Sequence, residues 1–169
     1  FSSTIRDRVV ERVERRAKYL LIRLQGGITW LCHLGMSGRW TLLGDEIEST
    51  PGRFANGAPV GSGDGPHDWV VIFLENGSRA VYSDHRRFGF MDCFPSAEQE
   101  THKLLKDIGP EPTPDHLTPS QLAEGLRGKR TPIKSALLDQ RVVAGLGNIY
   151  VCEILHRACV SPRRKASSV

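Results

Sequence analysis

The first third of the chain is organised as short apolar runs separated by glycines. The runs occupy residues 19–22, 28–31 and 40–43, and each gap between them contains two glycines. Apolar segments of this length, bounded by glycine, are typical of β-strands joined by tight connections. The chain therefore begins, by this pattern, with strands.

A hairpin and a long loop follow. Residues 44–68 are rich in glycine and proline and show neither a helical nor a strand period, which predicts a mobile surface loop. Apolar character returns at residues 69–74 and 79–82, with the turn sequence Glu75-Asn76-Gly77-Ser78 between them. An Asn-Gly pair between two such runs favours a β-hairpin.

Helical patterns dominate after Pro95. Ser96 is a good N-cap for a helix whose apolar face would contain Leu104, Leu105 and Ile108 and which would end at Gly109. Further helices are expected over residues 120–126, 132–138 and 149–158.

These patterns predict an α+β protein. The proline-rich residues 110–119 divide a β-rich domain at 1–112, of β-sandwich type, from a helical domain at 113–169. No internal repeat is visible.

Composition and charge narrow the class of protein. With 169 residues, of which 39% are hydrophobic and 25% charged, the chain has the composition of a folded globular protein. A net charge of +4 is weak evidence for an anionic partner by itself. The basic residues are nevertheless clustered, at 6–23, 86–87, 129–134 and 163–165, which favours a basic face that binds nucleic acid.

Cysteines and terminal patterns set further expectations. The four cysteines include no C-x-x-C pair, so neither a zinc site nor a disulfide framework is indicated. No apolar run approaches the roughly 20 residues that span a bilayer, and no signal peptide is recognisable. These features predict a soluble, cytoplasmic protein. The first residue is Phe1 and not Met, which suggests a chain that is entered midway.

Two segments carry residues suited to DNA. In residues 139–150, Gly145 and Gly147 precede Asn148 at the start of a helical pattern, where free backbone N–H groups could bind a phosphate. The alternative is a plain turn with an asparagine cap. In residues 83–90, Arg86 and Arg87 stand beside Phe88; they could bind phosphate and wedge between bases, or be a surface pair beside a core phenylalanine.

Taken together, several segments resemble the formamidopyrimidine-DNA glycosylase family. The resemblance rests on residues 139–150 with Ser161-Pro162, which are similar to its helix-two-turn-helix motif, and on Ser83-Asp84-His85-Arg86-Arg87-Phe88-Gly89, which is similar to its D-P-R-R-F-G signature with His85 in place of the proline. His33-Leu34-Gly35-Met36-Ser37-Gly38 and Arg15-Arg16-Ala17-Lys18-Tyr19-Leu20 match two more family segments. The resemblance extends from about residue 12 to residue 162.

The resemblance implies roles for individual residues. Met36, Arg86 and Phe88 would enter the gap left by a flipped base, which must leave the stack before its damaged atom can be reached. Lys18 would contact DNA and assist strand elimination, and Asn148 would hold the phosphate chain. Further DNA contacts are implied for His33, His67, Arg87 and Arg130.

The family resemblance also implies an activity. Its members remove oxidised purines, such as 8-oxoguanine and formamidopyrimidines, from duplex DNA and then cut the abasic strand by β,δ-elimination, without a redox cofactor. The expected partner is double-stranded DNA with oxidised or abasic lesions, and the expected state is a monomer in the bacterial cytoplasm.

Two parts of the family's machinery lie outside these residues. The family begins with Pro-Glu, whose proline nitrogen attacks the sugar, and ends with a four-cysteine zinc finger. We therefore expect a segment that binds damaged DNA without catalysing, within a full-length protein that holds one structural zinc.

Two other functions remain possible from the sequence. One is a non-catalytic, architectural DNA-binding module, which would show no preference for lesions. The other is an unrelated β-rich enzyme, in which Asp84-His85 or His33 would be acid–base groups.

Overall fold

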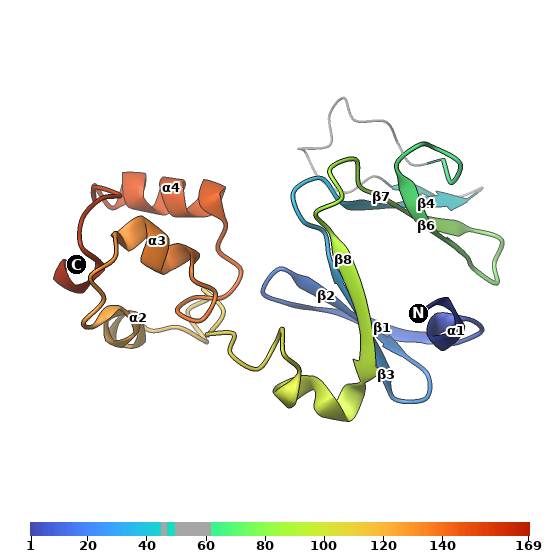
Figure 1. Ribbon diagram of the computed structural model, residues 1–169, viewed down its shortest axis with the longest axis horizontal. Coiled ribbons are helices and arrows are strands. Elements are labelled where there is room, and N and C mark those ends of the chain that lie inside the picture. The colour runs from blue at the N-terminus through green and yellow to red at the C-terminus, as the bar shows by residue number, and fades with distance from the viewer. Residues whose placement is uncertain (45–46, 50–61) are drawn as a thin grey trace. The chain divides into compact units, whose positions relative to one another are not determined.

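A computed structural model describes residues 1–44, 47–49 and 62–169 (Figure 1). Its strands are β1 (Val10–Arg16), β2 (Tyr19–Leu24), β3 (Ile28–His33), β4 (Arg39–Gly44), β5 (Ile47–Ser49), β6 (Asp68–Phe73), β7 (Arg79–Ser83) and β8 (Phe90–Pro95). Its helices are α1 (Ser2–Ile5), α2 (Pro119–Leu126), α3 (Ile133–Leu138) and α4 (Asn148–Arg157), with 3-10 turns η2 (Ser96–Thr101) and η3 (Ala166–Ser168).

The strands form two four-stranded sheets, with the orders β1-β2-β3-β8 and β5-β4-β7-β6. All three strands predicted in the first third of the chain are present, as β2, β3 and β4. The Asn76-Gly77 hairpin is also confirmed, since β6 and β7 pair antiparallel. Gly77 adopts the positive φ of 82° that such a turn requires, and its amide donates to Leu74 O at 3.0 Å.

The predicted loop at 44–68 is only partly described. Residues 45–46 and 50–61 lie outside the described residues. The remainder differs from the prediction at one point, because residues 47–49 form the short strand β5, which pairs with β4 through Leu42 and Ser49. Backbone pairing along β4 makes a strand there without any apolar period in the sequence.

Strand β1 was not predicted as a strand. Its sequence has five charged residues and two valines, Val10 and Val13, which are both exposed. It lies at the edge of its sheet next to β2, so it has little apolar signal from burial. An exposed edge strand of this composition is therefore easily taken for a polar segment.

The helix predicted from Ser96 to Gly109 is wrong in type and extent. The segment forms the 3-10 helix η2, which ends at Thr101, and Pro95 is its N-cap without a side-chain hydrogen bond. His102 is extended (ψ 130°), and its ring stacks on Phe94 at a centroid distance of 4.1 Å. This contact holds His102 out of the helical conformation, and isolated turns follow it.

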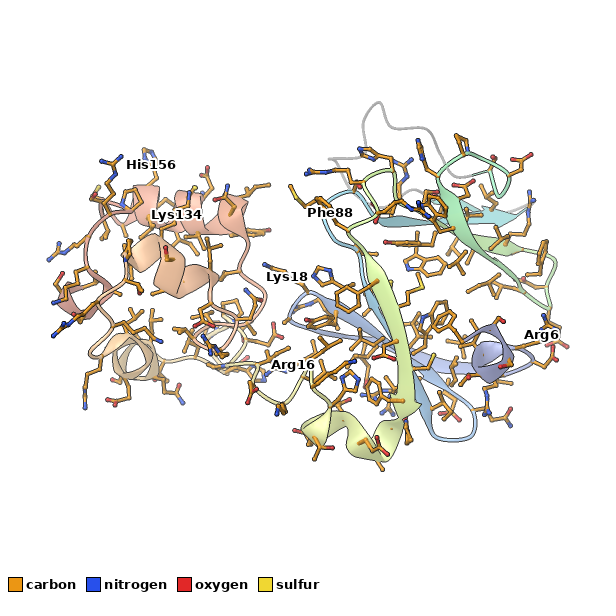
Figure 2. The ribbon with its side chains drawn as sticks, viewed as in Figure 1. Arg6, Arg16, Lys18, Phe88, Lys134 and His156 are labelled. Atoms are coloured by element: carbon orange, nitrogen blue, oxygen red, sulfur yellow. The ribbon has the colours of Figure 1, made fainter. Side chains whose placement is uncertain are left out.

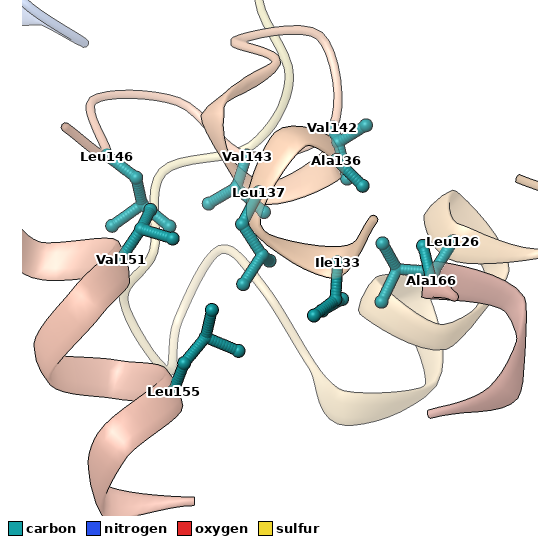
Figure 3. Packing of buried hydrophobic residues seen from close by; sticks show 10 residues of the cluster. All are labelled: Leu126, Ile133, Ala136, Leu137, Val142, Val143, Leu146, Val151, Leu155 and Ala166. Carbon is teal, nitrogen blue, oxygen red and sulfur yellow. The ribbon is translucent and has the colours of Figure 1, made fainter. Parts of the chain in front are cut away.

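The three later helices are confirmed within one or two residues of their predicted bounds. Thr118 caps α2 with a complete capping box that includes Gln121, and Pro119 occupies the first turn, where its missing N–H costs nothing. Buried side chains from α2, α3, α4, η3 and the loop before α4 form one apolar cluster, drawn in Figure 3. Leu137, Val143 and Val151 are among its members. This cluster fixes the start of α4.

The described residues divide into two compact units, residues 1–30 with 93–169 and residues 31–92. The domain division at 112/113 remains a prediction. The α+β class, with a β-rich part followed by helices, is confirmed. Among the helices that the structure describes, none is long and apolar enough to span a membrane.

Candidate nucleic-acid interface

The predicted DNA-binding residues fall into two groups, one in each compact unit. Residues 31–92 hold His33, Met36, His67, Arg86, Arg87 and Phe88, and the other unit holds Lys18, Arg130 and Asn148. Each group is described within its own unit.

In the unit of residues 31–92, two loops approach each other at their glycines. A Cβ placed at Gly35 would lie 2.6 Å from the backbone nitrogen of Gly89, and one at Gly89 would lie 2.9 Å from His33 O. Side chains cannot be accommodated at such distances, and Gly35 also has a positive φ of 64°. The glycines therefore allow the loop after β3 to lie directly against the loop before β8.

A buried carboxylate holds these two loops together. Asp84 is only 2% exposed and accepts hydrogen bonds from Ser37 Oγ and from Gly89 N, the latter at 2.8 Å. Ser37 Oγ accepts in turn from the amide of Arg86 at 3.1 Å. One hydroxyl thus connects the loop that carries Met36 to the loop that carries the two arginines.

The charge of Asp84 is stabilised by these donors. Burial alone would raise the pKa of Asp84. Hydrogen bonds from Ser37 and from the backbone amides of Gly89, Arg86 and Arg87 outweigh burial and hold the pKa below its usual value. An ionised carboxylate whose oxygens already accept from this chain is unsuited to general acid–base catalysis, so Asp84 has a structural role.

Large side chains project from the loops that Asp84 organises. Met36 is 72% exposed and Phe88 is 56% exposed, and the guanidinium carbon of Arg86 lies 4.8 Å from the centre of the Phe88 ring. Figure 2 shows Phe88 on the loop that precedes β8. The structure therefore places Met36, Arg86 and Phe88, which the family resemblance grouped, on two loops that touch each other.

Arg87 and the histidines lie on neighbouring positions of the same unit. The guanidinium of Arg87 stacks 3.8 Å over the Trp69 ring, and Arg87 has a left-handed backbone with φ 58°. His67 is exposed, and its ring centre lies 6.1 Å from that of His85. His33 is half-buried and stacks on Phe90 at 5.2 Å.

In the other unit, Lys18 is at the tip of the β1–β2 hairpin (Figure 2). Its neighbour Ala17 is buried with a positive φ of 52°, and the amide of Ala17 donates to Glu111 at 2.6 Å. Glu111 also binds Arg15 and Arg16, each at 3.0 Å. Burial would raise the pKa of Glu111, but these three donors hold it below its usual value.

The amino group of Lys18 lies beside the start of α4. A Cβ placed at Gly147 would be 3.7 Å from Lys18 Nζ. The lysine is exposed as a whole residue, yet its surroundings remove enough water from the amine to lower the pKa. A lysine of this kind holds a larger neutral fraction than a fully hydrated one.

Asn148 occupies the first turn of α4 and is exposed, together with Ile149 and Tyr150. The N-cap is Gly147, so Asn148 does not cap the helix with its side chain. The preceding loop is built around Gln140, whose side chain donates to Leu146 O and accepts from Gly145 N. The plain reading of Asn148 as a capping residue is therefore wrong.

Arg130 is exposed between α2 and α3. Among the interactions that the structure records for the described residues, none joins Arg130 to Lys18 or Asn148.

Several residues that build this surface were not singled out in the sequence. These residues are Ser37, Trp69, Glu111 and Gln140. The first three contact segments that lie 15 to 96 residues away, and Gln140 makes local contacts.

The basic cluster at residues 6–23 is largely engaged within the chain. Arg8 donates to Thr4 O and Gln25 O, and Arg23 binds Glu14 and Thr29. These arginines stabilise the fold, so the cluster contributes less to a basic face than its sequence suggests.

Comparison with known families gives two matches. A model of the formamidopyrimidine-DNA glycosylase N-terminal domain matches residues 1–91, and a model of the formamidopyrimidine-DNA glycosylase H2TH domain matches residues 108–169.

Similar full-length proteins agree with these matches. The chain is 51% identical over 160 residues to the formamidopyrimidine-DNA glycosylase of Ruegeria pomeroyi, covering 95% of the chain and 54% of that protein. It is 50% identical over 169 residues to that of Rhodopseudomonas palustris strain TIE-1, covering 100% of the chain and 57% of the relative. The chain thus spans a little over half the length of the curated relatives that it matches.

Solved structures with the same fold contain DNA. A complex of the LlFpg protein with THF-DNA and an inhibitor matches with a TM-score of 0.81 at 28% identity, covering 99% of the chain and 57% of that protein. MutM in complex with carbocyclic 8-oxo-G containing DNA matches with the same TM-score, identity and coverage. Lactococcus lactis Fpg with abasic-site DNA matches with a TM-score of 0.78 at 28% identity, covering 96% of the chain and 54% of that protein.

Proposed function

Because this chain belongs to the formamidopyrimidine-DNA glycosylase family, we propose that it is the damage-recognising part of a base-excision repair enzyme. The whole protein would remove oxidised purines such as 8-oxoguanine and formamidopyrimidines from duplex DNA. It would then cut the abasic strand by β,δ-elimination. The 169 residues themselves would bind lesion-containing duplex DNA.

The observation that carries this proposal is the exposed group of Met36, Arg86 and Phe88. Two large apolar side chains are held in water on loops whose backbone is fixed by Asp84 and by two glycine contacts. Such exposure is unfavourable unless a partner covers it. Apolar wedges beside an arginine suit the gap left by an extruded base, where the rings stack and the guanidinium meets base edges.

The first turn of α4 would hold the DNA backbone. Asn148 is exposed there, and the free N–H groups of a helix N-terminus attract phosphate. Lys18 lies next to this turn, and its lowered pKa favours a neutral amine that can accept a proton during strand elimination. His33, His67, Arg87 and Arg130 would add further contacts to DNA, mainly to phosphates.

Chemistry at the sugar needs an amine nucleophile, which in the family is an N-terminal proline followed by glutamate. We assign this nucleophile to none of the site residues described above, which we expect to bind DNA without attacking the sugar. No redox cofactor enters the proposed reaction.

A structural zinc forms part of the proposal for the whole protein. The cysteines of this chain do not fit such a site: Cys32 is buried, and no three metal-binding side chains come together among the described residues. We place the zinc ligands outside these residues. We also propose that the protein acts as a monomer in the cytoplasm.

The proposal is tested by binding of the chain to two duplexes, one with a tetrahydrofuran abasic-site analogue and one intact. We expect tighter binding to the abasic duplex. Arg86→Ala should reduce this preference by about tenfold, since a specific contact of this kind contributes roughly 1–3 kcal/mol. Arg12→Ala removes the same charge from an exposed position on β1 and should leave the preference unchanged.

Fluorescence anisotropy over a range of salt concentrations measures both affinities. Equal binding of wild-type chain to both duplexes would contradict the proposal and leave the architectural DNA-binding module as the better description.

A further inference from the structure

We propose that His85 is a second phosphate ligand, which acts with His67 to bind one phosphate of the DNA backbone. The inference rests on the proposed function and extends it, because His85 occupies the position where the family's signature has proline. A proline offers no polar side-chain atom. This chain therefore carries at that position a donor that the signature does not supply.

Three contacts fix the segment of His67 against the segment of His85. The amide of Asp84 donates to His67 O at 3.0 Å, and Trp69 Nε1 donates to Asp84 O at 2.8 Å. The Arg87 guanidinium covers the Trp69 ring at 3.8 Å. The backbone of His67 and the backbone of Asp84, which precedes His85, are thus held against each other.

The two imidazole rings are close and open to solvent. Their centres are 6.1 Å apart with an angle of 60° between the ring planes, and both residues are exposed. Rings at this separation can each direct an N–H group to an oxygen of the same phosphate, at the usual hydrogen-bond length of about 2.9 Å. Neither ring packs into the core, so the pair has no evident role in the fold.

The acceptor groups near the pair are occupied within the chain, which leaves the two rings and the adjacent arginines available to an anion. The adjacent carboxylates are already hydrogen-bonded within the chain: Asp84 by Ser37 and Gly89, and Asp68 by Ser83 and the amides of Gly63 and Gly65. Asp64 accepts from Ser62. Arg86 and Arg87 follow His85 directly, and the neighbouring residues 34–38 contain no charged side chain.

An imidazole and a guanidinium can both direct an N–H group to a phosphate oxygen, whereas a methyl group cannot. His85→Arg should therefore preserve the contact with phosphate, and His85→Ala should remove it.

The test compares wild type, His85→Ala and His85→Arg by anisotropy on abasic-analogue and intact duplexes, at one pH and constant ionic strength. We expect His85→Ala to bind both duplexes about fivefold more weakly than the wild type. His85→Arg should bind both duplexes at least as tightly as the wild type.

Two further variants sharpen the result. His67→Ala combined with His85→Ala should cost less than the two single changes together, because both act on one phosphate. His116→Ala, which changes an exposed histidine next to Thr113, is the matched control and should behave as wild type.

The inference is overturned if His85→Ala binds both duplexes as tightly as the wild type. This failure is distinct from failure of the proposed function. His85 should change affinity for both duplexes equally, whereas the preference for the abasic duplex depends on Arg86. If the chain prefers the abasic duplex but its affinity does not change when His85 is replaced, only the proposal of the histidine pair is refuted.

Discussion

Two of the three Arg-Arg pairs in the chain lie near a shielded carboxylate, and the side chains of these two pairs are used differently. Glu111 binds the guanidinium groups of Arg15 and Arg16 directly. Asp84 instead binds backbone amides and the Ser37 hydroxyl. The first carboxylate neutralises its arginines, while the second fixes the backbone beneath its arginines and leaves their side chains available.

The difference shows that the sequence alone does not tell which basic side chains are available to bind DNA. Arg16 also donates to Ile108 O and Gly109 O, so its guanidinium is committed to the fold. The structure records one contact for each guanidinium group of the second pair: that of Arg86 lies over the Phe88 ring, and that of Arg87 lies over the Trp69 ring. Such contacts leave the guanidinium N–H groups free to bind an anion.

The largest expected effect is that of Asp84→Asn. The change removes a buried charge and replaces one carboxylate oxygen by an NH2 group, so that either Ser37 or the Gly89 amide loses its acceptor. We expect a loss of about 3 kcal/mol in the free energy of unfolding at pH 7, measured by urea denaturation. Asp115→Asn, on an exposed turn, should change it by less than about 0.5 kcal/mol.

The same variant carries a prediction about pH. Because the pKa of Asp84 is lowered by folding, its contribution is fully present above the unfolded pKa of about 3.9 and is lost as pH falls through the lower folded value. The stability gap between wild type and Asp84→Asn should therefore shrink below about pH 4. A gap that stays constant in acid would show that the charge of Asp84 is unimportant.

Glu111→Gln should have a smaller effect. It weakens hydrogen bonds to two arginines and to the Ala17 amide, but Arg15 is more than half exposed, and solvent screens its share. We expect a loss of about 2 kcal/mol by urea denaturation. Glu124→Gln, which breaks only the exposed pair with Arg127, should cost less than about 0.5 kcal/mol. Equal losses in both variants would mean that Glu111 does not organise its segment.

The smallest effect separates the arginine pairs by their response to salt. Arg87→Gln should reduce the slope of log affinity against log salt by about 0.9, as expected for one lost phosphate contact. Arg16→Gln makes the same chemical change and should leave the slope unaltered, because its guanidinium already binds Glu111. A reduced slope in Arg16→Gln would remove the distinction between the pairs. Both slopes are obtained from anisotropy titrations of a duplex.

Local patterns predicted much of the fold. Strands β2 to β4, the Asn76-Gly77 hairpin and helices α2 to α4 follow from apolar runs, turn residues and caps close in sequence. Strand β1 and the turns after Ser96 did not, since one is an exposed edge and the other is set by stacking of His102 on Phe94. In both, the conformation depends on a neighbouring segment and not on an apolar period within the segment itself.

The site shows the same division. Met36, Arg86, Phe88 and Lys18 were found through short motifs. The groups that position them were not, because Ser37 and Asp84 are 47 residues apart and Arg15 and Glu111 are 96 apart. Asp84 even suggested an acid–base group in the sequence, and only its burial and its donors reveal a structural carboxylate.

The chain of hydrogen bonds from the Arg86 amide through Ser37 to Asp84 can run in one direction only. A carboxylate accepts and cannot donate, so the hydroxyl proton must point at Asp84 and its lone pair must face the amide. Each bond polarises the next, so the Ser37 hydroxyl is a stronger acceptor for the Arg86 amide than a hydroxyl without such a partner. The ionised carboxylate thus sets, through one oriented hydroxyl, the backbone position of the first of the two adjacent arginines.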